Sequence, residues 1–502
     1  MDMRPKAIVV GGGFSGLSAA AVLAKGGFEV HILEKNSQPG GRARVLKRDG
    51  FTFDMGPSWY WMPEVMEQFF NRFGKSTSDF FELRRLDPSY QVIGREGCSM
   101  AVPAGYQALR EFFECIETGS ASRLDEFLKQ ARLKYEKGMG EFVYKPGLSL
   151  REFADMRLLR SALKLDLFTS FSDHIRKYFR SEVLLQMLEF PVLFLGATPD
   201  KIPALYSMMN YADLKLGTWY PMGGMGKLVD AVVQTAIDAG ASLHLNTNVC
   251  GVKIEGGRIV AVRTDKGELE ADVVVSSADY HFTEQHLLPE KFRNYSAPYW
   301  DKRMMAPSCL LYYVGVDKKL PRLRHHNLFF EESFSRHAKA IYEKPEFPDR
   351  PLYYVCCPSQ TDDTVAPAGM ENLFILIPVA PGLKDTPEIR KKYFEDTIER
   401  LETYCGESIR RHVVSYSDYA VSDFINDYNA FKGNAYGLAN TLWQTAVFKP
   451  VIKNRKLANM YYTGQLTVPG PGVPPSFISG QIVADYIINQ YRKLKNIHET
   501  TV

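Results

Sequence analysis

A glycine-rich segment close to the N-terminus has the residue types and the spacing that can hold a dinucleotide phosphate. It reads Gly11-Gly12-Gly13-Phe14-Ser15-Gly16 and fits the pattern G-x-G-x-x-G. In such a turn Gly11 permits the tight bend, Gly13 lets the backbone approach a pyrophosphate, and Gly16 allows a helix to pack closely on a strand. We predict that this segment, with Phe14 and Ser15 beside the glycines, binds the phosphates of a dinucleotide cofactor.

An acidic residue follows at the distance that nucleotide recognition requires. Glu34 lies 23 residues after Gly11, where a carboxylate can accept hydrogen bonds from the hydroxyl groups of an adenosine ribose. The same negative charge would repel a 2′-phosphate, which argues against NADP. Lys35, the next residue, belongs to the same predicted site.

The elements that must position these residues can be predicted from the flanking sequence. Residues 6–10 are apolar and β-branched, which predicts a short buried strand, and the run LSAAAVLAKGG after Gly16 favours a helix. A second strand is predicted over residues 29–33, directly before Glu34. Strand, glycine turn, helix, strand and acid in this order form the full context of a dinucleotide-binding unit, which a glycine-rich surface loop would lack.

A second phosphate-binding segment follows the second predicted strand. Gly41 and Arg42, in Gly40-Gly41-Arg42, offer another close approach of the backbone with a cation beside it. A basic hairpin is the alternative interpretation of these residues.

The C-terminal region has the features of a flavin-binding loop. Gly464 and Gln465 follow a predicted strand, and residues 468–475, VPGPGVPP, contain Gly472, Val473 and Pro474. We expect this proline and glycine cluster to be a rigid loop that cannot be helical. An amphipathic helix is predicted after it, and its N–H groups could face the N1–C2=O edge of a flavin. A domain-closing helix after a linker is the alternative.

The middle of the chain predicts a further part of the nucleotide domain. Strands are expected over residues 242–245, 249–254, 258–264 and 272–276, with a hairpin turn at Glu255-Gly256-Gly257. Such a unit can bring the backbone of Val249 near an adenine. Residues 105–215 are predicted to be rich in helix, and residues 300–450 to mix strands with one helix near 387–404.

Composition and motif content argue against several classes of function. A net charge of +3 on 502 residues argues against a nucleic-acid partner, and no apolar run approaches the roughly 18 residues of a membrane-spanning helix. The seven cysteines form no C-x-x-C pair, which is typical of a reducing cytoplasm. We expect no metal site, because the adjacent His325 and His326 cannot easily face one ion from a strand. The chemistry must then come from a cofactor.

One stretch of the helical region combines basic and large apolar side chains. Residues 129–180 contain 12 Lys or Arg against 6 Asp or Glu. Such a surface can lie on an anionic bilayer, while a solvated charged face over an ordinary core is the alternative. The apolar side chains concerned are Phe153, Met156, Leu158, Leu159, Leu163, Leu165, Phe168, Phe171 and Phe179.

Several segments together resemble the bacterial-type carotenoid desaturases, a family of amine-oxidase-like flavoproteins. The resemblance is strongest in GGGFSGLSAAAVLAKGGFEVHILEKNSQPGGRA at 11–43, FTFDMGPSWYWMPEV at 51–65 and YYTGQLTVPGPGVPPSFISGQIVAD at 461–485. LEFPVLFLGATP, GTWYPMGGM and NAYGLANTLWQTAVFKP, starting at 188, 217 and 434, add to it. The resemblance covers nearly the whole chain and is nearest to phytoene desaturases that end in all-trans lycopene. It implies FAD as the cofactor, with Gly56, Pro57 and Ser58 also at the site.

The family resemblance implies an α/β architecture in three parts. A Rossmann-like FAD domain would be assembled from residues 1–75, 222–285 and 455–495. A mixed-sheet substrate domain would take residues 76–104 and 286–454, and a helical, membrane-associating lid residues 105–221. The protein would then be cytoplasmic and peripherally bound to the inner face of the cell membrane.

The implied substrate, phytoene, is a C40 hydrocarbon without a heteroatom, so only an apolar tunnel can position it. Desaturation would transfer a hydride to flavin N5 and release a proton from an allylic carbon, in up to four steps, with oxygen or a quinone as the final electron acceptor. We assign no catalytic residue, because water or a weak base can accept such a proton. The candidate tunnel residues are Trp59, Tyr60, Trp61, Phe190, Phe194, Trp219, Tyr220 and Trp443.

Other functions stay open at this point. The substrate could be a C30 dehydrosqualene-type precursor or a hydroxylated carotenoid, or the reaction could be a redox-neutral carotenoid isomerisation. An amine oxidase would need an aromatic cage around a cation, and no such cage can be identified from the sequence. A flavin-binding protein without catalytic activity is the alternative of a different class.

Overall fold

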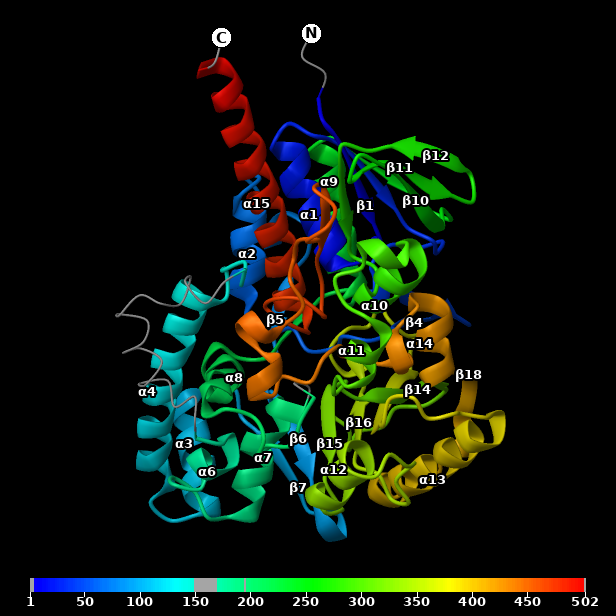
Figure 1. The fold of residues 1–502 in the computed structure, drawn as a ribbon. Coiled ribbons are helices and arrows are strands. Elements are labelled where there is room, and N and C mark those ends of the chain that lie inside the picture. Colours follow the sequence, from blue (N-terminus) through cyan, green and yellow to red (C-terminus); the bar gives the residue numbers. More distant parts are fainter. Residues whose placement is uncertain (1–3, 149–168, 194–195, 501–502) are drawn as a thin grey trace.

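A five-stranded parallel sheet forms the core of the part of the molecule that contains the glycine turn. The computed structural model describes residues 4–148, 169–193 and 196–500 (Figure 1). The strand order is β19-β13-β1-β2-β9, and every neighbouring pair is parallel. Strands β1, β13 and β19 are buried over almost their whole length, as expected for a parallel sheet covered by helices, while β2 and the edge strand β9 also contain polar residues. They are β1 (Lys6–Val10), β2 (Glu29–Leu33), β9 (Ala241–His244), β13 (Val273–Ser276) and β19 (Met460–Tyr462).

Three helices pack on this sheet or on one another: α1 (Phe14–Lys25), α9 (Gly226–Asp238) and α15 (Val473–Thr500). Helix α15 lies beside α1 (Figure 1), so the two ends of the chain meet. The expected non-helical loop was wrong at its end, because α15 already begins at Val473 and includes Pro474 and Pro475. Proline is tolerated there, since the N–H groups of a first helical turn have no partner within the helix.

A three-stranded antiparallel sheet extends from the nucleotide part of the molecule. It consists of β10 (Val249–Glu255), β11 (Arg258–Thr264) and β12 (Gly267–Glu270). The predicted hairpin turn at Glu255-Gly256-Gly257 is confirmed, with both glycines at positive φ.

A second large sheet is mixed and has seven strands. Its order is β18-β14-β17-β16-β15-β6-β7, and among the described strands β15 and β6 are its only parallel pair. Side chains on one face pack against α13 (Pro387–Cys405), which confirms the predicted helix. Residues of the other face, such as Leu311 and Leu376, belong to a different core cluster. The strands are β6 (Tyr90–Ile93), β7 (Ser99–Val102), β14 (Ser308–Val316), β15 (His326–Phe329), β16 (Tyr353–Cys356), β17 (Glu371–Val379) and β18 (Val413–Tyr419).

A helical region stands beside the mixed sheet (Figure 1). It contains α3 (Tyr106–Ile116), α4 (Ser120–Lys137), α6 (Phe171–Ile175), α7 (Glu182–Leu193) and α8 (Met208–Tyr211). Two of the apolar residues proposed for a membrane surface, Phe171 and Phe179, are instead buried in the core. The other seven lie outside the described residues. No helix in the described part of the chain is both long and apolar enough to cross a bilayer.

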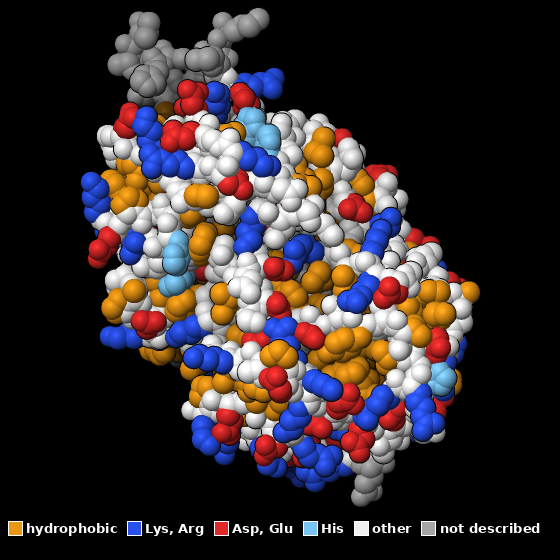
Figure 2. All heavy atoms as spheres, turned by 90° about the vertical axis from the view of Figure 1, so that its right-hand side faces the viewer, with side chains coloured by type: hydrophobic (Ala, Val, Ile, Leu, Met, Phe, Trp, Pro, Cys, Tyr) orange, Lys and Arg blue, Asp and Glu red, His pale blue; other side chains and the backbone are white. Residues whose placement is uncertain are grey.

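Shorter elements connect these parts of the molecule. They are the hairpin β3 (Val45–Arg48) and β4 (Phe51–Asp54), the pair β5 (Leu83–Arg85) and β8 (Trp219–Pro221), and the helices α2 (Pro63–Asn71), α10 (Tyr280–Phe282), α11 (Ala297–Asp301), α12 (Phe334–Tyr342) and α14 (Val421–Tyr428). The face seen in Figure 2 interleaves basic, acidic and apolar side chains. The fold class agrees with the prediction, while the three sets of domain limits stay predictions.

Candidate functional site

A cavity of about 830 Å³ brings the predicted site residues together. It extends from the carboxyl edge of the parallel sheet to the mixed sheet and the helical region. Every residue predicted to bind the cofactor lines it except Gly16. Contact between these residues and a cofactor stays a prediction, but segments far apart in the sequence do converge on one space.

The glycine turn has the geometry that a phosphate requires. Gly11 has a φ of +99°, and a Cβ on Gly16 would lie 2.1 Å from the carbonyl oxygen of Gly11. Gly16 therefore allows α1 to pack on the turn and does not face the cavity. A Cβ on Gly13 would meet no protein atom within 4 Å, and Gly13 is the residue before the first turn of α1. The open space at Gly13 and the free N–H groups of that turn suit an anionic ligand.

Glu34 is held in place by the same turn. It is buried, and its Oε2 accepts a hydrogen bond from the N–H of Gly12 at 2.8 Å, while Oε1 accepts one from the N–H of Asn36 at 2.9 Å. Each carboxylate oxygen has a second lone pair that can accept a ribose hydroxyl. The side chain of Lys35 donates instead to the carbonyl oxygen of Asn426, and burial lowers its pKa.

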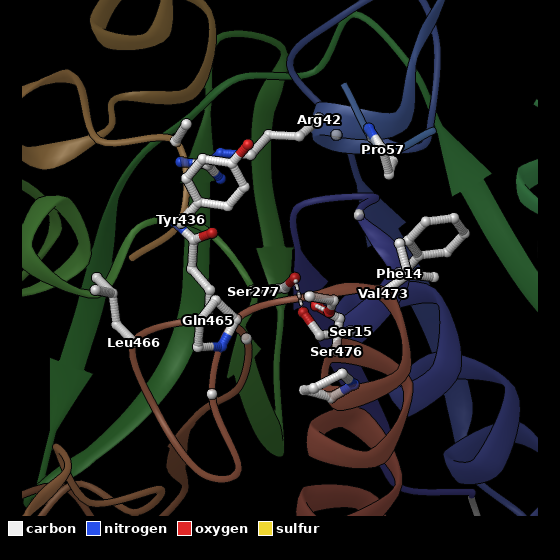
Figure 3. Close-up of a pocket in the computed structure, with 18 of the residues that line it drawn as sticks. Phe14, Ser15, Arg42, Pro57, Ser277, Tyr436, Gln465, Leu466, Val473 and Ser476 are labelled. Atoms are coloured by element: carbon white, nitrogen blue, oxygen red, sulfur yellow. Dashed lines mark hydrogen bonds between the residues drawn. The ribbon is translucent and has the colours of Figure 1, made fainter. Parts of the chain in front are cut away.

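Arg42 places a half-buried cationic side chain against the cavity (Figure 3). Its Nη2 donates to the carbonyl oxygen of Asn434 at 3.1 Å, and its guanidinium carbon lies 5.2 Å from the ring centre of Tyr428. Its Nε has no hydrogen-bond partner among the described residues, and burial lowers its pKa. A guanidinium with a buried, unused Nε donor fits a ligand that carries negative charge or acceptor oxygens.

The N-terminal and C-terminal segments are joined at the cavity by small polar residues. The hydroxyls of Ser15 and Ser277 lie 2.8 Å apart (Figure 3), and the N–H of Gly464 donates to the hydroxyl of Ser479 at 3.0 Å. A Cβ on Gly464 would lie 3.2 Å from Ser15 Oγ. The N-terminal turn and the start of α15 therefore form one site that is split across the chain.

Asp279 is a site residue that was absent from the sequence prediction. It lines the cavity, and its carboxylate accepts hydrogen bonds from the N–H groups of Phe282 and Phe431. Burial raises its pKa, although these two hydrogen bonds and, to a smaller extent, the charge of Arg42 partly oppose this shift. Its position three residues after β13 was the available signal, because ligands bind at the carboxyl ends of parallel strands.

Of the predicted tunnel residues, Trp59 and Trp61 line the cavity. Phe190 packs behind both of them, with ring centres at 5.5 and 6.1 Å. The assignment of Trp443 to a tunnel was wrong, because its side chain is 70% exposed. Phe194 lies outside the described residues. The remaining candidates, Tyr60, Trp219 and Tyr220, do not line the cavity and pack behind its wall.

A polar position lies beside the C-terminal loop. Lys449 Nζ and Asn440 Oδ1 are both buried and have no hydrogen-bond partner in the described part of the chain. Each would lie 3.4 Å from a Cβ on Gly470, which lines the cavity. Burial lowers the pKa of Lys449 to about 7. A donor and an acceptor without partners suit a polar ligand group or a water molecule.

The expectation for the adjacent histidines was wrong in its geometry. His325, His326 and Cys356 place ligand-type atoms within 4.8 Å of one another. The reason is that β15 begins at His326, so His325 lies in a bend before the strand and the alternation of strand side chains does not apply to it.

The fold has two parts, a parallel sheet with a glycine turn and a mixed sheet over an apolar cavity. Together with the split site between them, they define a flavoprotein that binds its flavin as a dinucleotide. A family model described as flavin containing amine oxidoreductase matches residues 14–488. The chain belongs to this family and to its carotenoid desaturase branch, and its cofactor is FAD.

Named relatives cover almost the full chain. It is 41% identical to a carotenoid 3,4-desaturase of Haloarcula japonica, over 96% of this chain and 97% of the relative. It is 30% identical to a zeta-carotene-forming phytoene desaturase of Myxococcus xanthus (96% and 93%), and 31% identical to a 4,4′-diapophytoene desaturase of Staphylococcus haemolyticus (96% and 98%). A solved oxidoreductase from Methanosarcina mazei shares the fold, with a TM-score of 0.61, 17% identity and coverage of 96% and 100%.

Proposed function

We propose that this protein desaturates 15-cis-phytoene in successive FAD-dependent steps to lycopene. The observation that carries the proposal is a single cavity that joins the nucleotide-binding turn at Gly13 to an aromatic wall at Trp59 and Trp61. A hydrocarbon offers no group for a salt bridge, so its position must come from shape and apolar contact. The similarity to a phytoene desaturase of Myxococcus xanthus supports the choice of substrate.

The residues of this chain would bind, orient and shield the reactants. The glycine turn and Glu34 would hold the adenosine and pyrophosphate of FAD, and Arg42 and the start of α15 would hold its flavin end. When bound, FAD supplies the hydride acceptor. The apolar wall would exclude water from the reacting carbons, while the positive end of α15 would favour negative charge near it.

The test is a reconstitution of the protein with FAD and phytoene in liposomes. We expect polyenes with increasing numbers of conjugated double bonds, identified by chromatography and absorption, and reduction of the flavin by phytoene under anaerobic conditions. Unchanged phytoene, under conditions in which a known desaturase works, would show that this function is wrong.

A second candidate is the 3,4-desaturation of a carotenoid that is already conjugated or hydroxylated. The 41% identity to a carotenoid 3,4-desaturase favours it. The same assay with lycopene, a hydroxylated carotenoid and a C30 precursor as substrates distinguishes the candidates. Product formation without an electron acceptor would identify an isomerase instead.

The proposed function also bears on where the protein lies in the cell and on which electron acceptor it uses. A hydrocarbon substrate dissolves in the bilayer, so we propose a cytoplasmic protein peripherally bound to the inner face of the cell membrane. Oxygen or a quinone would reoxidise the flavin. Stopped-flow reoxidation of the reduced enzyme by air-saturated buffer and by quinone vesicles compares the two acceptors directly.

A further inference from the structure

Three polar side chains form a hydrogen-bonded series that begins at the cavity wall. Ser58 and Tyr354 both line the cavity, and their hydroxyls lie 3.0 Å apart. The hydroxyl of Tyr354 lies 2.6 Å from Nδ1 of His326. His326 is fully buried, and the ring of Trp59 stacks on it with centres 4.0 Å apart.

The protonation of this pair follows from its burial. Burial lowers the pKa of His326 well below its ordinary value and raises that of Tyr354. Both groups are therefore neutral. We assign the proton of this hydrogen bond to the phenol, which then donates to Nδ1, and Sγ of Cys356 lies 3.7 Å from the same nitrogen. A neutral imidazole that accepts at Nδ1 carries its own proton on Nε2.

The series continues towards the surface through the second histidine. Nε2 of His326 and Nε2 of His325 both lack a partner among the described residues, and the two ring centres are 4.5 Å apart. A small cavity of about 10 Å³, lined by Ser58, His325 and Cys356, lies behind the wall. Its size is at the lower limit for one water molecule. Nδ1 of His325 lies 2.8 Å from the hydroxyl of Thr361, which is partly exposed.

These polar side chains lie in an apolar core, where burying them without full hydrogen bonding reduces the stability of the fold. The same core cluster contains Leu328, Phe374 and Leu376 around Tyr354. Imidazole nitrogens without partners are unfavourable in such a core, and apolar residues of similar size would remove that cost. A desaturase, however, releases a proton in a cavity from which water is excluded, and that proton must leave.

We propose that Tyr354 and His326 carry this proton from the cavity to the Thr361 side of the mixed sheet. The inference rests on the proposed desaturase function. When FAD is bound, it would accept the hydride of one C–H bond of the substrate together with both electrons of that bond. The neighbouring C–H bond breaks, its electron pair becomes the new double bond, and its proton passes to the oxygen of Tyr354. The phenolic proton moves to Nδ1 of His326, and the Nε2 proton of His326 passes by way of His325 to the Thr361 side, where solvent water accepts it.

The chain offers a matched control for the test. Tyr353 is the preceding residue of β16 and points to the opposite face, where its ring stacks on Phe329 with ring centres 4.3 Å apart. Its buried hydroxyl also lacks a partner within the described residues. Tyr354→Phe and Tyr353→Phe therefore remove the same atom from two sides of one strand.

The experiment uses the FAD-loaded protein with carotenoid in liposomes. The rate of anaerobic flavin reduction is measured in H₂O and in D₂O for the wild type, Tyr354→Phe, Tyr353→Phe and His326→Gln. We expect Tyr354→Phe and His326→Gln to reduce this rate by about 100-fold or more, as for the loss of other positioned proton acceptors, and to lose the solvent isotope effect. Tyr353→Phe should keep the rate and the isotope effect of the wild type.

A second readout does not need turnover. Imidazole ¹⁵N NMR of histidine-labelled protein should show a histidine signal with the proton on Nε2 and a hydrogen-bonded Nδ1 that is absent in His326→Gln and shifted in Tyr354→Phe but not in Tyr353→Phe. His337 has the same pattern, because its Nε2–H donates to the carbonyl oxygen of Pro378 and its Nδ1 accepts from the N–H of Leu352, and its signal should persist in every variant. Wild-type rate and isotope effect in Tyr354→Phe would overturn the relay and leave the desaturase function standing. A wild type that reduces no flavin with any carotenoid would overturn both. One metal ion per chain, lost in His326→Gln and Cys356→Ser, would assign the cluster to metal binding instead.

Discussion

Two glycines of the N-terminal turn impose different requirements although only two residues separate them. At Gly16 there is no space for a side chain, because a Cβ would lie 2.1 Å from the carbonyl oxygen of Gly11. At Gly13 there is space within the protein, and its φ of −79° is accessible to any residue. Gly16 is therefore required by the fold, and Gly13 by the ligand that the cavity accepts.

This difference leads to a prediction with opposite effects in the two variants. Gly16→Ala should destabilise the protein by about 3 kcal/mol, a large cost for overpacking. Gly13→Ala should leave the apoprotein within about 0.5 kcal/mol of the wild type and reduce its affinity for FAD at least tenfold. Thermal unfolding of the apoprotein and titration with FAD measure the two effects. Unchanged FAD affinity in Gly13→Ala would show that the pyrophosphate lies elsewhere.

Single residues also mark the limit of prediction from sequence. The glycine turn and Glu34 could be assigned because their spacing reflects local geometry. The aromatic residues could not, since Trp59 lines the cavity, Tyr60 is buried behind it and Trp443 is exposed. Which side of a wall an aromatic ring faces depends on packing between segments that are distant in the sequence.

At the scale of elements, close contact between α1 and α15 holds the split site together. A Cβ on Gly480 would lie 2.0 Å from Ser18 Oγ and 2.2 Å from the carbonyl oxygen of Ser15. The two helices can approach this closely only with glycine at position 480. Prediction of these helices succeeded because their periodicity is local, but their contact could not be derived from it.

Gly480→Ala should therefore separate the two helices. We expect a loss of about 3 kcal/mol in the free energy of unfolding and a parallel loss of FAD affinity, because Ser15 and Val473 would move apart. Gly251→Ala, for which a Cβ meets no atom within 4 Å, is the control. Equal stability of the two variants in denaturant titrations would contradict this account of the helix contact.

A buried carboxyl links the helical region to the mixed sheet. Asp213 accepts hydrogen bonds from the hydroxyls of Tyr90 and Thr218, and Thr218 in turn accepts one from the indole N–H of Trp61. Burial raises the pKa of Asp213 to about 7, and its hydrogen bonds oppose this shift only in part. The cavity wall at Trp61 therefore depends on a group that titrates near neutral pH.

The sign of the resulting pH dependence follows from proton binding. Between pH 3.8, the ordinary pKa of the carboxyl, and about 7, the folded state holds a proton at Asp213 that the unfolded state lacks. This stabilisation is complete below pH 3.8 and is lost as the pH rises to 7. Asp213→Asn should gain about 3 kcal/mol relative to the wild type between pH 5 and pH 8, at about 1.4 kcal/mol for each of the two pH units between 5 and 7. Melting curves across this range test it, with the exposed Asp230→Asn as control, and parallel curves for wild type and Asp213→Asn would rule it out.

For the whole molecule, the order of strands explains why a site divided over some 450 residues was predictable. A ligand binds at the carboxyl edge of parallel strands, and β1, β13 and β19 are adjacent in one sheet. Each strand was evident from its short apolar run. The mixed sheet has no such motif, and the outline of its cavity depends on loops such as 440–448 that have no periodic pattern.

The segment 440–448 leads to a prediction about the surface through which the protein binds a membrane. Trp443 is 70% exposed and Phe448 45% exposed, their rings lie 5.5 Å apart, and Phe448 also lines the cavity. Apolar side chains exposed at the mouth of a cavity are suited to insert into a bilayer and admit a hydrocarbon. Replacing both with Ser should weaken binding to anionic vesicles tenfold or more, since burying one such side chain contributes about 1.5–3 kcal/mol.

The control for this surface is a pair of similarly exposed residues elsewhere. Val414 on β18 and Ile425 on α14 are 50% and 44% exposed, and Ser at both should leave vesicle flotation unchanged. FAD content should stay at the wild-type level in both double variants. If the two double variants float equally well, the membrane-contact surface lies elsewhere. The proposal requires that vesicle binding is lost only when the replaced residues lie at the mouth of the cavity, and not whenever exposed apolar area is removed. A wild type that does not float with the vesicles would refute the peripheral attachment itself.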